Sequence, residues 1–241
     1  MANLTHLKML EDLDGFVAVD KPAGIAFSTV VKTVRRKFNL VKVGHGGSLD
    51  PAASGLLVLL INDANKFTGD VMGADREWEG VMRLGLKTNT YDMQGEPVAP
   101  AAPVQPPSDE AIAKALPEFR GDIFQTESRW CSVRREGSAG YEIADTGEHK
   151  PFLAHVYKFE VERTGSPDRL AFKVAGTKGL IVRSLVNDFG DAVGTGACLE
   201  SLRRTRVGKF RLEDAVPFDR ILETDIADFA SLAIPVAKAF A

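Results

Sequence analysis

The chain has 241 residues, of which 44% are hydrophobic, enough for one large domain or two small ones. Lysine and arginine number 30 against 33 acidic residues, so the formal net charge of −3 argues against a protein that holds nucleic acid by charge alone. Cys131 and Cys198 are the only cysteines, too few for a disulfide framework or a zinc knuckle.

The first half of the chain alternates short β-type runs with apolar residues at helical spacing. In chain order these predict a strand at residues 15–20, a helix at 28–38, a glycine-rich loop at 44–55, a strand at 56–61, a helix at 64–72 and a strand at 77–85. Ser28 is the expected N-cap of the first helix. The run 56–61 is apolar at every position, which predicts a strand buried on both faces.

The second half continues with mixed elements. In chain order we expect a proline-rich extended connector at 97–107, a helix at 108–116 capped by Ser108, a strand at 121–125, a hairpin turning at 165–168 and a helix that opens at 178–179 and ends near 194–196. On the first hairpin strand His155 alternates in step with Phe159 and Val161, so we expect His155 to line the core.

The loop 44–55 reads Gly-His-Gly-Gly-Ser-Leu-Asp-Pro-Ala-Ala-Ser-Gly. Its glycines permit positive φ angles, and the Asp50–Pro51 step stops a helix from running through it, so a carboxylate is displayed on a bent loop. The strand at 56–61 anchors that loop on a rigid element. On the residues alone, an isolated Asp-Pro is far more often an ordinary turn than a catalytic loop, and that interpretation stays open.

Two clusters of basic residues offset the acidic balance locally. They are Lys32, Arg35, Arg36, Lys37 and Lys42 before the loop, and Arg203, Arg204, Arg206, Lys209 and Arg211 late in the chain. If both clusters face one cleft they supply phosphate contacts, and if not they are solvated helix and strand faces.

The loop and several other segments resemble the TruB family of tRNA pseudouridine synthases, whose signature reads approximately Gly-His-Thr-Gly-Ala/Ser-Leu-Asp-Pro-x-Ala-x-Gly. The other matching segments are residues 20–24, 83–85, 90–92, 178–179 and 183–185. The resemblance extends from about residue 15 to about residue 222.

The resemblance implies the pseudouridine synthase fold, an α+β fold with a large mixed, mostly antiparallel sheet flanked by helices and loops. It implies a catalytic domain at residues 1–224, with an RNA-gripping insertion at about 126–150. A short helical tail is expected at 225–241, leaving no room for the C-terminal PUA domain that many family members carry.

The implied activity is the isomerisation of a specific uridine to pseudouridine, in the T-loop of tRNA or in another structured RNA, by a monomer without metal or cofactor. The uridine must first be flipped out of its stack. Asp50 is the implied catalytic carboxylate, and Arg183 is the implied arginine that pairs with it. Trp78 stands where the family has a tyrosine that stacks on the uracil, although its strand pattern alone favours a core position.

His45, Gly47, Lys21, Arg203 and Arg204 complete the set expected to bind RNA or shape the site. The chain departs from the family at Gly46 in place of Thr, at Ile181 in place of Tyr, and at Asp145 in place of Arg. The two prolines usual after Gln125 are also missing. The charge reversal at Asp145 would weaken RNA binding if that residue lies beside a phosphate. It therefore bears on RNA affinity and on the choice of substrate.

Two other function classes stay open on the sequence. A non-catalytic RNA-binding or RNA-remodelling protein could retain the scaffold, in keeping with the departures above. A carboxylate-based hydrolase of glycosidic bonds would need a second acid, for which Asp20 and Asp92 are the candidates.

The compartment follows from the termini and the cysteines. Residues 1–10 carry neither an apolar segment nor a small-residue cleavage site, which argues against secretion. No membrane-spanning run is present, and the four histidines show no metal-ligand spacing. We therefore expect a cytoplasmic protein that binds neither membrane nor metal.

Overall fold

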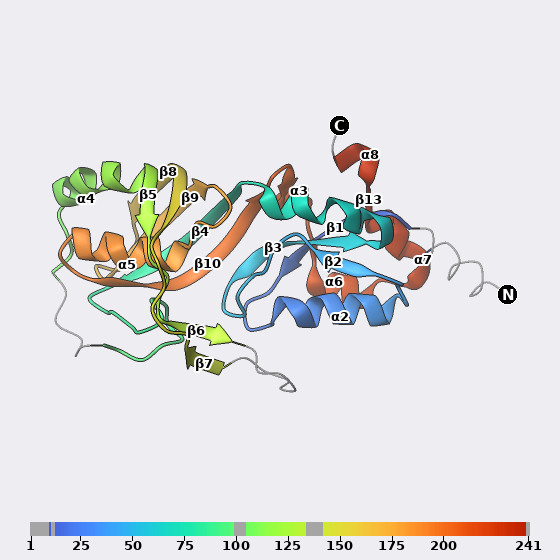
Figure 1. The fold of residues 1–241 in the computed structure, drawn as a ribbon, viewed down its shortest axis with the longest axis horizontal. Coiled ribbons are helices and arrows are strands. Elements are labelled where there is room, and N and C mark those ends of the chain that lie inside the picture. The colour runs from blue at the N-terminus through green and yellow to red at the C-terminus, as the bar shows by residue number, and fades with distance from the viewer. Residues whose placement is uncertain (1–9, 11–12, 99–104, 134–141, 240–241) are drawn as a thin grey trace. The chain divides into compact units, whose positions relative to one another are not determined.

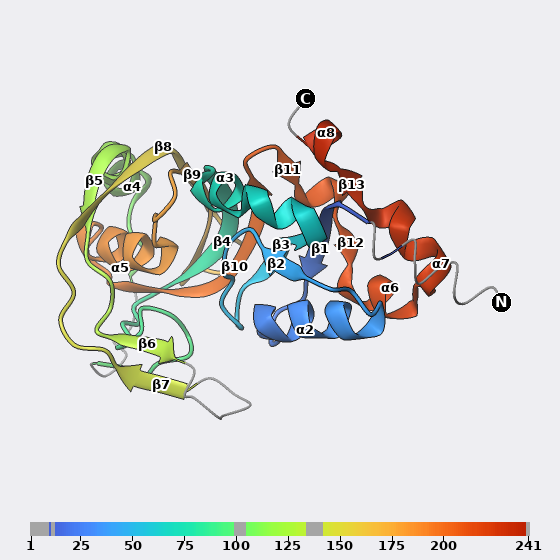
Figure 2. The ribbon, with the colours of Figure 1, turned by 45° about the vertical axis from the view of Figure 1, so that its right-hand side comes forward.

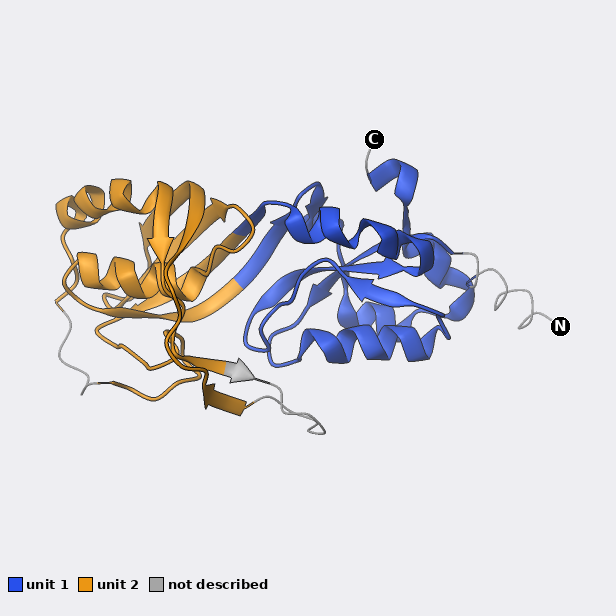
Figure 3. Ribbon diagram, viewed as in Figure 1, with its two compact units in different colours: residues 1–77, 203–241 blue, residues 78–202 orange. Residues whose placement is uncertain are grey.

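The computed structural model describes residues 10, 13–98, 105–133 and 142–239, and the chain divides into two compact units. Unit 1 comprises residues 1–77 and 203–241, and unit 2 comprises residues 78–202 (Figure 3). The strands β4 (Arg76–Leu84) and β10 (Ala197–Val207) contribute residues to both units.

Unit 1 is built on a mixed sheet with the strand order β12-β1-β3-β10 (Figure 1). The strand β1 (Gly15–Lys21) pairs antiparallel with β3 (Ser54–Ile61), and β10 joins β3 in parallel. Short strands extend the sheet: β2 (Val43–His45), β11 (Phe210–Arg211), β12 (Val216–Pro217) and β13 (Ile234–Pro235).

Helices cover both faces of this sheet. They are α2 (Phe27–Lys37), α3 (Thr68–Gly73), α6 (Phe218–Glu223), α7 (Ile226–Phe229) and α8 (Val236–Ala239). Figure 1 shows α2 and α3 on opposite sides of β3. Leu57 and Leu59 cluster with Val34 of α2 on one face, while Val58 clusters with Val71 of α3 on the other. The expected burial of β3 on both faces is therefore confirmed.

Unit 2 has the strand order β10-β4-β9-β8-β5, with β5 (Gly121–Gln125), β8 (Phe152–Arg163) and β9 (Arg169–Gly176). Its helices are α4 (Asp109–Ala115) and α5 (Val182–Ala192), and Val186 and Phe189 of α5 join the core with Phe159 and Phe172. The strands β6 (Trp130–Val133) and β7 (Glu142–Asp145) form a separate ribbon, visible apart from β5 and β8 in Figure 2.

The α+β class and the mixed sheet expected from the sequence are confirmed, and most predicted elements are present. Ser108 caps α4 by accepting a hydrogen bond from the Ala111 amide at 3.2 Å, as predicted. The Ser28 cap is wrong, because α2 begins at Phe27 and its N-cap, Ala26, has no side-chain oxygen. The last long helix begins at Val182 rather than at 178–179, because Gly179 has φ of 96° and belongs to the preceding turn.

The core position expected for His155 is also wrong. The pairing of β8 with β9 shifts register between Val156 and Lys158, so the alternation of side chains changes face at that point. Val156 and Phe159 are buried, whereas the His155 side chain is 42% exposed, and its Nδ1 lies 2.6 Å from the Asp122 carboxylate.

The predicted tail at 225–241 contains short helices, but also β13, whose Pro235 pairs with Gly15 of β1. Within the connector and the insertion, residues 99–104 and 134–141 lie outside the described residues. Among the residues that the structure describes, no helix combines the length and apolar character needed to cross a membrane.

Candidate functional site

The loop that displays Asp50 joins β2 to β3 in unit 1, and Asp50 is exposed at its tip. Backbone hydrogen bonds hold it at several points. The Gly46 amide donates to Val58 O at 2.8 Å, the Ala53 amide donates to Asp50 O at 3.1 Å, and the Gly24 amide donates to Pro51 O at 2.7 Å. The loop is therefore tied both to β3 and to the turn that follows β1.

Arg204 anchors the same loop from beneath. Its residue exposure is 1%, and its guanidinium donates to Leu56 O at 2.8 Å, to Ser48 O at 2.9 Å and to Gly47 O at 3.3 Å. Burial and the neighbouring charge of Arg76 lower the pKa of Arg204, whereas the charge of Asp50 raises it. We infer that Arg204 positions the loop, because its donors face backbone carbonyls in the interior.

Lys21 is a second buried cation under the loop, with 0% exposure. Its Nζ donates to Ile25 O at 2.7 Å, to Pro22 O at 2.8 Å and to Pro51 O at 3.3 Å. Burial lowers the pKa of Lys21 to about 8, Asp50 opposes this shift, and Arg204 adds to it. Lys21 thus ties the turn after β1 to the residue that follows Asp50.

Two glycines make this arrangement sterically feasible. Gly47 has φ of 130° and Gly55 has φ of 99°, a region that favours glycine. A Cβ on Gly47 would lie 2.9 Å from Arg76 Nη2, and one on Gly55 would lie 2.4 Å from Arg204 O. Glycine at position 47 thus has a local structural reason, and its expected role in RNA binding stays a prediction.

His45 lies half-buried at the start of the loop. Its ring centroid is 4.7 Å from that of Phe27, and its Nδ1 accepts a hydrogen bond from the Gly47 amide at 3.3 Å. Burial is the largest cause of a lowered pKa for His45; the backbone contact with Gly47 opposes this shift, and the charge of Arg204 adds to it.

Arg203 neighbours Arg204 in sequence but is partly exposed. Its Nη2 donates to Asp20 Oδ2 at 2.7 Å, and its Nη1 lies 3.4 Å from Ser54 Oγ. Asp92 in unit 2 accepts hydrogen bonds from Thr90 Oγ1 at 2.6 Å and from the Gln94 amide at 2.9 Å. Asp20 and Asp92, the candidates for the second acid of a glycosidic-bond hydrolase, thus both have local hydrogen-bond partners.

The remaining expected site residues lie in unit 2. Trp78 on β4 is partly buried and packs against the core cluster of that unit, in keeping with its strand pattern. Arg183, in the first turn of α5, has only 13% of its side chain exposed, so it is not a solvated surface arginine. The pairing of Arg183 with Asp50 joins residues of different units and stays a prediction.

The surroundings of Arg183 contain residues that the sequence reasoning missed. Arg183 Nη2 donates to Glu127 Oε1 at 2.7 Å and lies 3.4 Å from Cys131 Sγ. Burial is the main cause of a raised pKa for the Cys131 thiol, and the charge of Arg183 opposes it. The one feature of the sequence that could have drawn attention to this cluster is Glu127, which stands where the family usually has proline.

Comparisons with known proteins match this chain over most of its length. The model of the TruB family pseudouridylate synthase N-terminal domain matches residues 35–182, and that of the tRNA pseudouridylate synthase B C-terminal domain matches residues 183–229. The tRNA pseudouridine synthase B of Opitutus terrae is 37% identical over 232 residues, which cover 95% of each chain. The protein of that name from Gluconacetobacter diazotrophicus is 37% identical over 234 residues, covering 95% of this chain and 76% of the other.

Among solved structures, a chain of a Cbf5–Nop10–Gar1 complex superposes with a TM-score of 0.69 at 25% identity. The superposition covers 97% of this chain and 63% of that one. Because one family model alone spans more than half of the sequence, the chain belongs to the TruB family of pseudouridine synthases.

Proposed function

We propose that this chain isomerises a specific uridine of tRNA to pseudouridine, in the T-loop, with Asp50 as the catalytic carboxylate. The observation that carries the proposal is the support of the Asp50 loop by two buried cations, Lys21 and Arg204, in a chain of the TruB family. The relatives named tRNA pseudouridine synthase B support tRNA as the substrate.

The reaction breaks the glycosidic bond between N1 and C1′, turns the uracil and joins C5 to C1′. The target uridine must leave its stack, at a cost of a few kcal/mol, and stacking on an aromatic side chain returns about 1–3 kcal/mol. We assign that stacking face to Trp78, which has an indole ring but no hydroxyl. Asp50 acts at the reacting nucleotide from a loop that its backbone bonds and Arg204 hold in place.

Arg183 is the proposed partner of Asp50. An arginine stays charged while it lies beside a carboxylate, so it can pair with Asp50 throughout the reaction. Within unit 2, Arg183 also donates to Glu127.

The T-arm is the proposed contact surface of tRNA, and the exposed cations of α2 are the proposed phosphate ligands. Lys32, Arg35 and Arg36 are exposed on that helix. We assign Arg203 and His45 to the rim of the site, and Lys21, Gly47 and Arg204 to the support of the loop. The proposed setting is a monomer in the cytoplasm.

Release of tritium from tRNA labelled at C5 of uridine tests the proposal, because isomerisation frees that hydrogen whatever the position of the uridine. Asp50→Asn should abolish release while leaving RNA affinity nearly intact, and Asp70→Asn, a change at an exposed residue of α3, should leave release unchanged. Retained turnover in Asp50→Asn would reject the assignment of Asp50.

Two further results would favour the other function classes. Wild-type protein that binds T-arm RNA but releases no tritium, with equal binding by Asp50→Ala, would identify a non-catalytic RNA-binding protein. Free uracil among the products would identify a hydrolase.

A further inference from the structure

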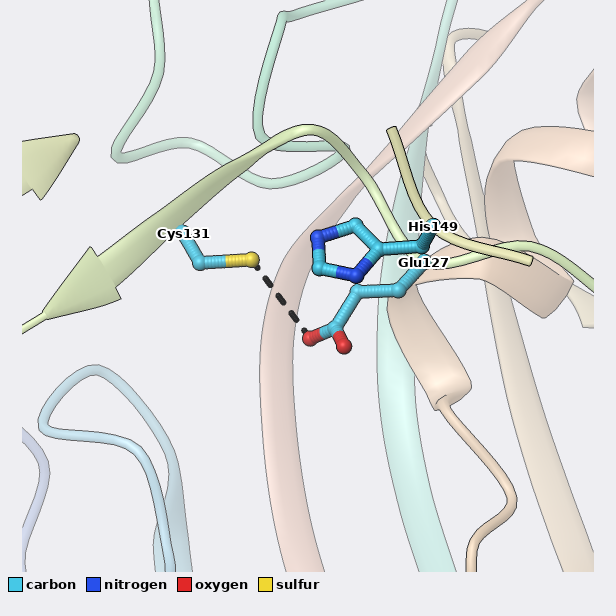
Figure 4. A group of neighbouring side chains, drawn as sticks. All are labelled: Glu127, Cys131 and His149. Atoms are coloured by element: carbon cyan, nitrogen blue, oxygen red, sulfur yellow. Dashed lines mark hydrogen bonds between the residues drawn. The ribbon is translucent and has the colours of Figure 1, made fainter. Parts of the chain in front are cut away.

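Three side chains with different ligand atoms converge in unit 2 around the start of β6. The carboxylate of Glu127, the thiol of Cys131 and the imidazole of His149 have ligand atoms that all lie within 4.8 Å of one another. Cys131 Sγ lies 3.4 Å from Glu127 Oε1. Figure 4 shows the thiol and the carboxylate pointing toward one another, with the imidazole ring beside them. All three residues are half-buried.

We propose that Glu127, Cys131 and His149 bind a zinc ion, with a fourth coordination position open to water. Zinc accepts sulfur, nitrogen and carboxylate oxygen, and sites with three protein ligands and one open position are a recurring zinc arrangement. Magnesium and calcium prefer oxygen ligands throughout, so the thiol and the imidazole select against them.

The fold supports the orientation of the ligands. The ribbon of β6 and β7 pairs Cys131 with Ala144, which brings the chain beyond β7 back toward Glu127. The Thr146 amide donates to Arg129 O at 2.8 Å, and Thr146 Oγ1 lies 2.9 Å from His149 Nε2. When Nε2 donates its proton to that hydroxyl, Nδ1 is left as the ligand nitrogen, and such a second partner fixes the ring of a metal-binding histidine.

Arg183 contacts two of the three ligands, and its charge must be compatible with the ion. A carboxylate has about four lone-pair sites, so Glu127 can accept from Arg183 and still coordinate a metal. With Cys131 as thiolate and His149 neutral, the ligands carry two negative charges against the single positive charge of Arg183. The net charge of −1 still attracts a divalent cation. The proton of the Cys131 thiol is released to solvent when the zinc–sulfur bond forms.

The sequence argued against a metal because the histidines and cysteines lack ligand spacing. Spacing along the chain detects sites built within one short segment. Here Glu127 precedes the ribbon, Cys131 lies on β6 and His149 follows β7, so the ligands meet only after β6 and β7 have paired.

Cobalt titration of the full chain, freed of metal, tests the proposal. We expect a thiolate-to-cobalt charge-transfer band in the near ultraviolet, which zinc then abolishes by displacing the cobalt. Cys131→Ser and His149→Gln should each weaken zinc binding by at least about 10–100-fold, measured by competition with a chromophoric chelator. Glu127→Gln, which keeps the side-chain shape, should weaken it in the same direction.

The chain provides matched controls for both residue types. Cys198→Ser and His155→Gln alter residues outside the cluster and should leave the cobalt band and the zinc affinity unchanged. Absence of the band in wild-type protein, or an unchanged zinc affinity in Cys131→Ser, would overturn the proposal. So would a loss of the band in Cys198→Ser.

A measurement on wild-type protein keeps the test independent of how well the variants fold. Alkylation followed by peptide mass spectrometry reports each cysteine separately. Zinc should slow the alkylation of Cys131 and leave the rate at Cys198 unchanged. Equal alkylation of Cys131 with and without zinc would contradict the site.

Discussion

Replacement of Arg204 by methionine tests how the Asp50 loop is held. Arg204→Met keeps an unbranched apolar side chain but removes the donors to Gly47, Ser48 and Leu56. A hydrogen bond from a charged group contributes about 1.5–3 kcal/mol. Burying the guanidinium charge costs desolvation free energy in the wild type. The methionine variant avoids that cost, which offsets part of the stability lost with the three hydrogen bonds. Three backbone carbonyls lose their donor, at a cost of about 1–3 kcal/mol each, so after this offset we expect the free energy of unfolding to fall by about 3–5 kcal/mol.

Arg203→Met is the matched control for stability, because it changes the adjacent residue on the same strand. Arg203 has 36% of its side chain exposed and pairs with Asp20, so its loss should cost about 0–1 kcal/mol. Urea unfolding of both variants measures the difference. Arg204→Met should also slow tritium release at temperatures where it is folded. Equal destabilisation by the two variants, or a loss below about 1 kcal/mol for Arg204→Met, would refute the anchoring role.

Three further predictions concern the loop and the proposed stacking face. Gly55→Ala forces a side chain into positive φ and against Arg204 O, so it should lower stability by about 1–3 kcal/mol in thermal unfolding. In Gly69→Ala the new Cβ meets no atom within 4 Å, so stability should not fall. Burial lowers the pKa of Lys21 from 10.5 to about 8, so between these two values the unfolded chain binds more protons than the folded one. The free energy of unfolding of the wild type, relative to that of Lys21→Met, should therefore rise as the pH rises from about 8 to about 10.5, and this gain should be lost as the pH falls back to 8. A stability difference independent of pH would contradict this. Trp78→Tyr restores a hydroxyl and should preserve or raise the rate of tritium release, whereas a collapse in rate would show that the site depends on indole.

The sequence predicted elements whose signal is local and repeated. The apolar run at 56–61 could form only an element buried all round, and β3 is buried on both faces. Ser108 followed by acidic residues marks a helix start, because a side-chain oxygen there satisfies an amide that the helix leaves unpaired. The glycines and Asp50–Pro51 likewise indicated a bent loop, since they restrict the backbone in their own neighbourhood.

Features that arise from pairing between segments were not visible in the sequence. The register shift in β8 depends on how that strand meets β9, so alternation counted along β8 alone put His155 on the wrong face. The cluster of Glu127, Cys131 and His149 depends on the pairing of β6 with β7. No spacing rule along the chain reports either event.

The two basic clusters show why a charge count is a poor guide to RNA contact. In the later cluster Arg204 is buried against carbonyls, Arg203 pairs with Asp20, and Arg206 pairs with Glu77. Those arginines therefore contribute mainly to the internal structure of unit 1. In the earlier cluster Lys32, Arg35 and Arg36 are exposed on α2, whose Val30 and Val34 are buried. The phosphates of RNA can contact only solvent-exposed cations. Within unit 1, the basic side chains of α2 should therefore attract RNA more strongly than those of β10.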